Sequence, residues 1–471
     1  MGVIAQIALG VLAISFFTFV ALFGRNPSLR AEFSLMRNQA ERLANGAPSV
    51  KTSTKTATDR THNHRHTPIA WLYRAMWVTI PAAILAVDGR LTGGRFTAWM
   101  GRTSHFIMYG RHPTVLIFFV ALLAGGEFMF LPGAWPRMTA MHRFCGSVAI
   151  ALPYVFLWLS ARADPGTVTA ATHARWMAHY PYDFALFHPG HRCRTCGLLK
   201  PARSKHCGVC GRCVHKMDHH CVFINNCVGY GNQHFFILLL LSTAVLTAYG
   251  ACVGLALVSE NVRRRRPEYS LWKPSCPKSM GWSEWLVLFT LGVQDDVGVG
   301  SVTLLTLMTS PLVWGLLAYH VYLIYCGTTT NESMKWQDWQ AEMDDGCAFK
   351  RAMPADRPKN PGVEAPRTRW PVMPVQVLVR TEDGRPPAAA FGPGVGEWQR
   401  VWKLRDVENL YDIGFVDNLI DVFVPNYPFR DEVPPSAMDG NGMKLDLERG
   451  RKAKGRKPKV SAAASLVNAA T

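Results

Sequence analysis

A cysteine- and histidine-rich block at residues 193–227 carries the residue types that could do chemistry in this chain. It holds seven of the twelve cysteines. Three pairs have the pattern C-x-x-C: Cys193 with Cys196, Cys207 with Cys210, and Cys210 with Cys213. At that separation one tight turn can direct two thiolates at the same Zn²⁺ ion. Three such pairs with histidines between them therefore predict zinc binding.

The number of ligands in this block fits two zinc ions and leaves one cysteine over. Two closed tetrahedral sites need about eight protein ligands. The block supplies Cys193, Cys196, Cys207, Cys210, Cys213, Cys227, His206 and His220. Cys221 then remains, directly after Asp218 and His219 in the chain. A free thiol beside an imidazole that a carboxylate can orient is typical of an activated nucleophile. The count shows that one cysteine is left over, but it does not identify which one.

Two other interpretations of the block compete with this one. Disulfide bonds would need paired cysteines, whereas an odd number with histidines beside them suits metal binding in a reducing compartment better. A zinc hydrolase would use Asp218, His219 and His220 as metal ligands. The ligand count argues against it, because two closed sites need neither Asp218 nor His219.

Long apolar segments lie on both sides of the block. A bilayer core about 30 Å thick needs about 20 apolar residues in a helix, and buried core helices are seldom apolar all round for that length. Five segments are predicted to span: 3–24, 113–133, 144–161, 234–258 and about 299–326; a sixth candidate, 71–87, contains Arg74. A signal peptide is the alternative for 3–24, but it lacks a preceding basic segment and a clear cleavage site. The predicted fold is a polytopic α-helical membrane protein with five or six transmembrane helices.

The order of these segments predicts four regions. They are residues 1–190 with the N-terminal transmembrane helices and loops, 191–233 with the cysteine-rich zinc domain, 234–335 with the C-terminal transmembrane helices, and a tail at 336–471. Residues 336–408 are rich in proline, glycine and charge, which predicts a flexible or extended segment. The net charge of +18 is explained by loops that face anionic lipids, so the lipid bilayer is the expected partner and nucleic acid is not.

The block resembles the DHHC protein S-acyltransferases, integral membrane enzymes that attach fatty acyl chains to cysteines of other proteins. The matching residues are C-x-x-C at 193–196, Lys200-Pro201-x-Arg203, His206-Cys207, Cys210, Cys213, Asp218-His219-His220-Cys221, Asn226-Cys227-x-Gly229 and Asn232. Weaker matches are Asp164-Pro165-Gly166, Thr329-Thr330-Asn331-Glu332 and NLYDIGFVDNLIDVFVP at 409–425, which contains Asn418. Together the matches cover roughly residues 113–425.

The resemblance implies a cytosolic double-zinc domain beneath a helical bundle that holds the acyl chain. Carried over by motif, two structural Zn²⁺ ions would have these ligands: Cys193, Cys196, His206 and Cys213 for one, and Cys207, Cys210, His220 and Cys227 for the other. The implied enzyme is a protein-cysteine S-palmitoyltransferase with acyl-CoA as co-substrate and an acyl-Cys221 intermediate. His219 would be the general base and Asp218 would fix its tautomer, while Thr330 and Asn418 would give structural support.

Two departures from the family pattern lie directly after Cys221. Val222 and Phe223 stand where most members have proline and tryptophan, so a catalytically silent zinc-dependent scaffold stays open as an alternative. Lys200, Arg203, Lys205 and Lys216 are candidates for contacts with the phosphates of CoA, but for each of them a solvated side chain or a contact with lipid headgroups is the favoured alternative. The general organisation is similar to fungal members that act on SNARE proteins, and we expect membrane-proximal cysteines as substrates. The expected location is the endoplasmic reticulum membrane, with the Golgi membrane as the alternative.

Overall fold

The computed structural model describes residues 80–269, 271, 281–354 and 356–429. The chain divides into two units, and the boundary in the sequence falls between His112 and Pro113. In the first unit, α4 (Ile80–Leu91) and α5 (Arg95–Tyr109) are joined by a turn at Gly93 and Gly94 with positive φ. The predicted span at 3–24 lies outside the described residues, and the candidate at 71–87 overlaps them only in the first part of α4.

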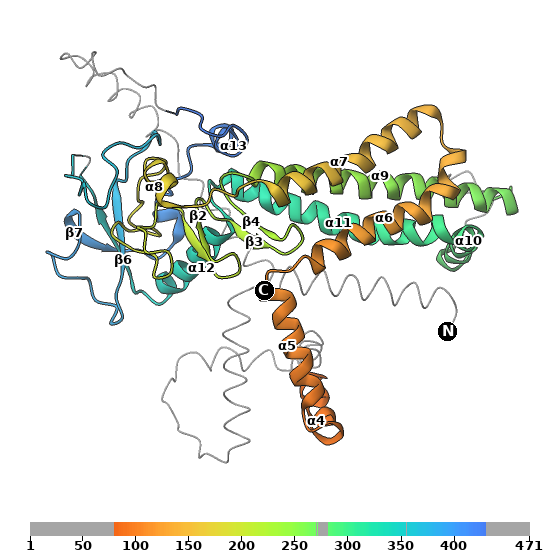
Figure 1. Ribbon diagram of the computed structural model, residues 1–471, viewed down its shortest axis with the longest axis horizontal. Coiled ribbons are helices and arrows are strands. Elements are labelled where there is room, and N and C mark those ends of the chain that lie inside the picture. The colour runs from red at the N-terminus through yellow and green to blue at the C-terminus, as the bar shows by residue number, and fades with distance from the viewer. Residues whose placement is uncertain (1–79, 270, 272–280, 355, 430–471) are drawn as a thin grey trace. The chain divides into compact units, whose positions relative to one another are not determined.

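Four long helices of the second unit run side by side (Figure 1). They are α6 (Thr114–Ala134), α7 (Ala140–Arg162), α9 (Gln233–Arg265) and α11 (Val297–Tyr325). All four are long and apolar enough to cross a membrane, and they coincide with the four predicted segments after residue 112. The predicted class of polytopic α-helical membrane protein is therefore confirmed. The total of five or six spans stays a prediction.

Small residues let these helices approach closely. A Cβ atom on Gly254 of α9 would collide with the side chain of Thr303 on α11, so only glycine permits this contact. The short α10 (Trp282–Asp295) packs on α9 in the same way, with Gly292 against the carbonyl of Val258. At the end of the bundle where α9 finishes, Arg137 of the 3₁₀ helix η3 (Trp135–Arg137) donates to Asn261 at 2.8 Å. The contact ties the loop after α6 to the last turns of α9.

The cysteine-rich block folds at the opposite end of the bundle. Helix α8 (Ala170–Met177) precedes two antiparallel hairpins. The first pairs β1 (Lys205–Cys207) with β2 (Arg212–Val214), and the second pairs β3 (His219–Cys221) with β4 (Asn226–Val228). The block follows the end of α7 and leads into the start of α9, so the antiparallel order of the helices puts it at one end of the bundle.

The region after α11 is folded, so the predicted flexible or extended segment at 336–408 is wrong. It contains α12 (Thr330–Asp344), β5 (Ala348–Ala352), β6 (Gln376–Arg380), β7 (Val395–Arg400), η4 (Leu404–Asp406) and α13 (Phe415–Phe423). The three strands form one antiparallel sheet in the order β6-β5-β7. Trp370, Val377 and Tyr411 are buried against Tyr180 and Phe184 from the segment after α8. The C-terminal region is therefore packed onto the zinc domain.

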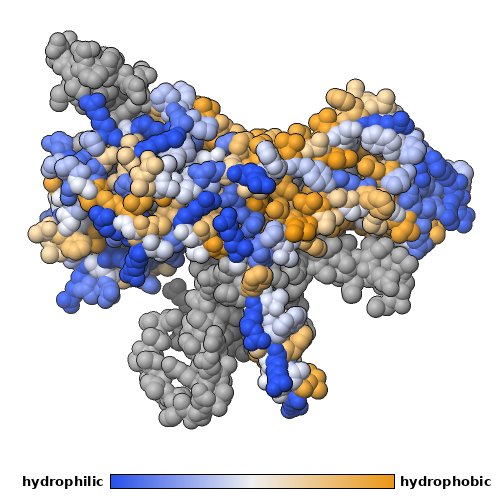
Figure 2. Space-filling view, viewed as in Figure 1, coloured by the Kyte–Doolittle hydropathy of each residue, from blue (hydrophilic) through white to orange (hydrophobic). Residues whose placement is uncertain are grey.

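The distribution of hydrophobic and hydrophilic residues on the surface matches the division between the helical bundle and the other folded regions. Figure 2 shows hydrophobic residues gathered over the helical bundle, with hydrophilic residues over the zinc and C-terminal regions and again at the far end of the helices. The far end includes the run Arg263–Arg266, where Arg264 pairs with Glu260 and Arg265 with Asp295. An apolar band between two polar ends is what a bilayer requires.

Candidate active site

Two clusters of cysteine and histidine contain all eight predicted zinc ligands, in the two sets that the family pattern implies. In each cluster the ligand atoms lie within 4.8 Å of one another. The Nδ1 atom of His206 is 3.5, 3.4 and 3.8 Å from the sulfurs of Cys193, Cys196 and Cys213. For a tetrahedral zinc with its usual Zn–S and Zn–N bonds this separation is about 3.5 Å. The side chains therefore fit Zn²⁺.

The second cluster has the same geometry. The Nδ1 atom of His220 is 3.7, 3.4 and 3.7 Å from the sulfurs of Cys207, Cys210 and Cys227. With four protein ligands each, bound zinc ions would hold the chain together and leave no open position for a substrate. Asp218 and His219 belong to neither cluster, which argues against the zinc hydrolase.

Local backbone structure explains why the ligands converge. Two of the three C-x-x-C turns, 193–196 and 207–210, are followed by a glycine with positive φ, Gly197 at 71° and Gly211 at 66°, a conformation that a side chain would strain. The backbone N–H of Cys196 donates to the sulfur of Cys193 at 3.4 Å. The hairpins supply the remaining ligands in facing pairs: His206 opposite Cys213, and His220 opposite Cys227.

Cys221 is the last residue of β3 and lies outside both clusters. It is buried, and it pairs across the hairpin with Asn226. The side-chain amide of Asn226 donates to the carbonyls of Ser160, Ala161 and Ala163 at 3.3, 3.2 and 3.0 Å. The hairpin with the free thiol is thus attached directly to the end of α7.

Asp218 and His219 lie beside this thiol. The Nδ1 atom of His219 is 2.8 Å from Asp218 Oδ2, while the backbone N–H of Thr330 donates to Asp218 Oδ1. Thr330 therefore contacts Asp218, as the family pattern implies, but through its backbone. Thr329 next to it donates to the carbonyl of Met217 at 3.3 Å, so the start of α12 is bonded to the loop before β3.

The three groups shift each other's pKa values. Burial opposes ionisation of Asp218, but hydrogen bonding to His219 outweighs it and holds the pKa of Asp218 far below its usual range. Burial also opposes protonation of His219, yet Asp218 and Cys221 together raise the pKa of His219 to about 10. Burial raises and the His219 interaction lowers the pKa of Cys221, with a net decrease. The arrangement favours a thiolate beside an imidazolium.

Apolar side chains from four helices surround Cys221. The cluster includes Leu157 of α7, Phe236 of α9, Leu317 of α11 and, partly buried, Phe119 of α6. Phe223 packs edge-on against Phe119 with ring centroids 5.9 Å apart, so an aromatic contact is made where most family members have tryptophan. The Cys221 thiol therefore lies among apolar side chains of the helical bundle.

Three of the four basic residues considered as candidates for CoA contacts are bonded within the protein. Arg203 is buried and donates to both oxygens of Glu332 at 2.7 and 2.6 Å. Lys216 is buried and donates to Asp421 Oδ2 at 2.7 Å. Neither side chain can reach a soluble ligand without breaking an ion pair, and Lys205 already donates to Asn331 at 2.7 Å.

The C-terminal motif at 409–425 holds the end of α11. Asn418 donates to the carbonyl of Tyr325 at 3.4 Å and to Asp412 at 2.9 Å. Two further residues, whose roles the sequence analysis missed, attach this motif to the end of α11 and to the zinc domain. Asn409 donates to the carbonyl of Cys326 at 2.8 Å, and Asp421 accepts from Lys216. A polar residue three positions after Asn418, on the same helical face, was the available signal for Asp421.

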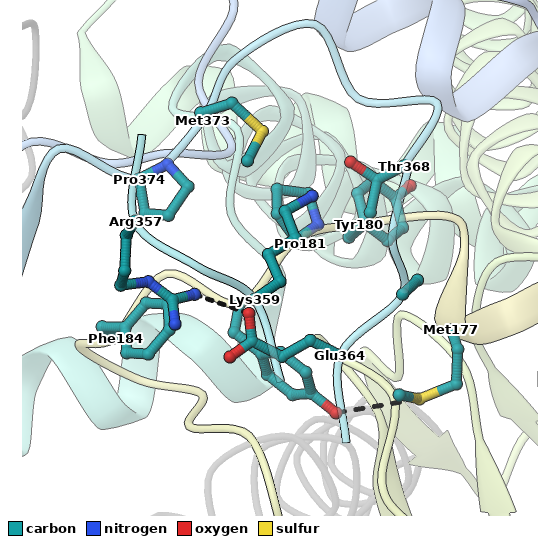
Figure 3. A pocket seen from close by; sticks show the side chains of 12 residues that line it. Met177, Tyr180, Pro181, Phe184, Arg357, Lys359, Glu364, Thr368, Met373 and Pro374 are labelled. Carbon is teal, nitrogen blue, oxygen red and sulfur yellow. Dashed lines mark hydrogen bonds and ion pairs between the residues drawn. The ribbon is translucent and has the colours of Figure 1, made fainter. Parts of the chain in front are cut away.

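A hollow lies between the segment after α8 and the C-terminal region (Figure 3). It is lined by Met177, Tyr180, Pro181, Tyr182, Phe184, Arg357, Lys359, Glu364, Ala365, Thr368, Met373 and Pro374. Arg357 pairs with Glu364 at 2.5 Å and stacks over Phe184, and Lys359 donates to the carbonyl of Pro366. Since these charged groups are bonded within the protein, the hollow is a packing feature.

Comparison with known proteins agrees with the geometry. The family model described as DHHC palmitoyltransferase matches residues 186–337. Palmitoyltransferase SWF1 of Neurospora crassa is 50% identical, over 96% of this chain and 99% of the relative. Palmitoyltransferase swf1 of Schizosaccharomyces pombe is 35% identical over 58% and 73%, and Palmitoyltransferase ZDHHC4 of Mus musculus is 31% identical over 50% and 69%. With two zinc-compatible clusters, a free thiol beside an Asp–His pair and this similarity along nearly its whole length, the chain belongs to the DHHC palmitoyltransferase family.

Proposed function

We propose that Cys221 carries the acyl group in the protein S-palmitoylation that this family performs, with His219 as general base and Asp218 as its orienting partner. The observation that carries the proposal is the 2.8 Å contact between Asp218 Oδ2 and His219 Nδ1 beside a cysteine outside both metal clusters. This contact leaves His219 Nε2 as the nitrogen that exchanges protons, as in other activated thiols.

The reaction follows in two steps. The Cys221 sulfur, after its proton passes to His219, attacks the thioester carbonyl of acyl-CoA. The bond between that carbonyl and the CoA sulfur breaks, and CoA leaves with the proton from His219. A cysteine thiol of the protein substrate then gives its proton to His219 and attacks the acyl-Cys221 carbonyl. The Cys221 sulfur departs and is reprotonated, so the enzyme is restored.

The apolar surroundings of Cys221 suit the acyl chain. A palmitoyl chain gains about 0.8 kcal/mol for each CH₂ group that leaves water, or on the order of 12 kcal/mol for its whole length. Leu157 and Phe223 belong to the same apolar cluster as Cys221, so an acyl chain bound there would lie against apolar side chains next to the sulfur. The same need for apolar burial explains why the reaction belongs at a membrane.

The supporting roles are proposed on the same basis. Thr330 holds Asp218 through its backbone N–H, and Asn418 attaches α13 to the end of α11. The zinc ligands are proposed to be Cys193, Cys196, His206 and Cys213 for one ion, and Cys207, Cys210, His220 and Cys227 for the other. Zinc on these side chains would support the catalytic hairpin from both sides.

We extend the proposal to the substrates and the location of the enzyme. The substrates are proteins with cysteines close to the membrane, including SNARE proteins, and the enzyme resides in the endoplasmic reticulum membrane with its zinc domain in the cytosol. The fungal relatives, similar over nearly the whole chain, are named as palmitoyltransferases, which supports protein substrates at a membrane. Deleting the gene should lower S-acylation of SNARE proteins in an acyl-exchange assay, and a fluorescent fusion should colocalise with an endoplasmic reticulum marker. A Golgi pattern would reject the location alone.

The central test is labelling of the purified full-length protein with a palmitoyl-CoA analogue, followed by hydroxylamine. Wild type should take up a hydroxylamine-sensitive label, Cys221→Ser should not, and Cys347→Ser, outside the block, should label like wild type. Zinc content measured on the same samples should be two per protein in all three. Label that persists in Cys221→Ser refutes the assigned nucleophile. A folded, two-zinc wild type without label would favour the silent scaffold.

A further inference from the structure

A second imidazole approaches the Asp218 carboxylate from the helical bundle. His320 lies near the end of α11, and its side chain is buried. Its Nδ1 atom is 3.9 Å from Asp218 Oδ2, the oxygen that contacts His219 at 2.8 Å. The carboxylate therefore lies between a histidine of the zinc domain and a histidine of a membrane helix.

One aromatic ring holds both histidines in place. Phe236 of α9 is buried and presents its ring at 5.2 Å and 73° to His219, and at 5.2 Å and 79° to His320. The two imidazoles are 5.8 Å apart, centre to centre. Asp218 is thus enclosed by residues of β3, α9 and α11, so its surroundings depend on the packing of the zinc domain against two helices.

The carboxylate has room for another donor. An ionised carboxylate offers about four acceptor positions, and Asp218 is 2% exposed, so water has little access to it. Thr330 and His219 each occupy one oxygen. At 3.9 Å the His320 contact is longer than a hydrogen bond, which is the separation at which a small side-chain rotation or one bridging water completes the interaction.

We propose that His320 is a positioning residue for acyl transfer, whose Nδ1–H donates to Asp218 Oδ2, directly or through one water, and so fixes the carboxylate that orients His219. This inference rests on the proposed roles of Asp218 and His219. A buried charge-assisted hydrogen bond gains strength from the low dielectric around it. Without His320, Asp218 could turn toward other donors and His219 would lose its alignment with Cys221.

The test compares two replacements of His320 in the full-length enzyme. In His320→Asn the amide nitrogen can take the place of Nδ1, whereas His320→Leu keeps the volume and removes the donor. Self-acylation is followed at increasing palmitoyl-CoA concentrations. His320→Leu should lower the maximal rate about tenfold, the effect of losing one hydrogen bond to a charged group, with KM for palmitoyl-CoA unchanged. His320→Asn should recover most of the rate, and both variants should bind two zinc ions.

Combination with Asp218→Asn separates positioning from packing. If His320 acts through Asp218, adding His320→Leu to Asp218→Asn should cause no further loss of rate. Ser310→Ala removes another buried polar group of α11 and should behave like wild type. The inference is overturned by a wild-type rate in His320→Leu, by fully multiplicative losses in the double variant, by an effect on KM alone, or by equal loss of zinc in both His320 variants.

The same series distinguishes this inference from the proposed function. Label retained by Cys221→Ser would reject the nucleophile on which both depend. A series in which Cys221→Ser and Asp218→Asn lose label while His320→Leu labels at the wild-type rate would reject the role of His320 alone.

Discussion

Replacing Asp421 by asparagine should strongly destabilise the contact between α13 and the zinc domain. The Asp421 carboxylate accepts from Lys216 at 2.7 Å, from Arg369 at 3.0 Å and from Tyr180 at 2.8 and 2.7 Å. It is 3% exposed, and Lys216 is 4% exposed. One carboxylate therefore compensates a buried lysine and a half-buried arginine.

The magnitude follows from leaving these cations without their counter-ion. Breaking a buried ion pair by removing one partner costs about 3–5 kcal/mol. For a folded region of about 150–250 residues, each kcal/mol lowers the melting temperature by about 2–4 °C. The Asp421→Asn protein should therefore melt about 6–20 °C below wild type. Because the pKa of Asp421 lies below its ordinary value, through Lys216 and Arg203 acting against burial, the stabilisation is present at neutral pH and lost in acid.

The assay heats full-length protein in detergent with a zinc-sensitive dye, so that zinc release reports melting of the zinc domain. Asp417→Asn is the matched control, since Asp417 is on the same helix with an exposed side chain. It should melt within about 2 °C of wild type. If Asp421→Asn melted at the same temperature as Asp417→Asn and wild type, the reasoning would be refuted, because the buried Lys216 and the half-buried Arg369 would then have lost their counter-ion without cost.

Three further predictions concern Cys221, Cys213 and Arg203. Alkylation of Cys221 by iodoacetamide, followed by peptide mass spectrometry, should stay fast as pH falls toward 7, since the pKa of this thiol is lowered by His219 against the effect of burial. His219→Gln should move the midpoint of that pH profile to higher pH, and an unchanged midpoint would contradict the pairing. Cys213→Ser should lower the metal content from two zinc ions to about one per protein by elemental analysis; two retained ions would reject this ligand. Arg203→Lys should lower the stability by about 2–3 kcal/mol in the melting assay, because lysine cannot reproduce the two-pronged contact with Glu332, whereas Arg405→Lys at an exposed position should have no effect.

The cysteines and histidines of the two clusters could be predicted from the sequence because metal geometry acts locally. A tetrahedral site restricts both the residue types and their spacing, so the C-x-x-C pairs indicated metal binding by themselves, while the division into two sets of four came from the family resemblance. The four described membrane helices were predictable for a similar reason, since bilayer thickness imposes a length and a composition. In both cases the signal lies within a few turns of chain.

The C-terminal sheet was missed because its contacts are distant in the sequence. β5 has five residues and pairs with β6 and β7, which are separated from it by long proline- and glycine-containing loops. Such short strands give too few alternations to be seen by pattern. The proline, glycine and charge content alone therefore predicted a flexible or extended segment in a region that is folded.

Long-range pairing also decides the roles of the basic residues considered for CoA. The ion-pair partners of Arg203 and Lys216, which are Glu332 and Asp421, follow after two membrane helices, so these pairs could not be predicted from the sequence. His320 had an available signal, because an ionisable residue inside an apolar segment usually faces the interior of a bundle. The contact of His320 with Asp218 could not be predicted from the sequence, since it depends on how the zinc domain packs against the helices.

The hydrogen bonds between Asn226 and the last carbonyls of α7 fix the position of Cys221 along the membrane normal. The end of a membrane helix cannot move far along the membrane normal without exposing apolar residues to water or burying polar ones. Cys221 is therefore held at a nearly constant depth, and a substrate thiol must come to that depth to be acylated. The enzyme can then select its targets by how far a cysteine lies from the membrane surface, with little need to read the residues around it.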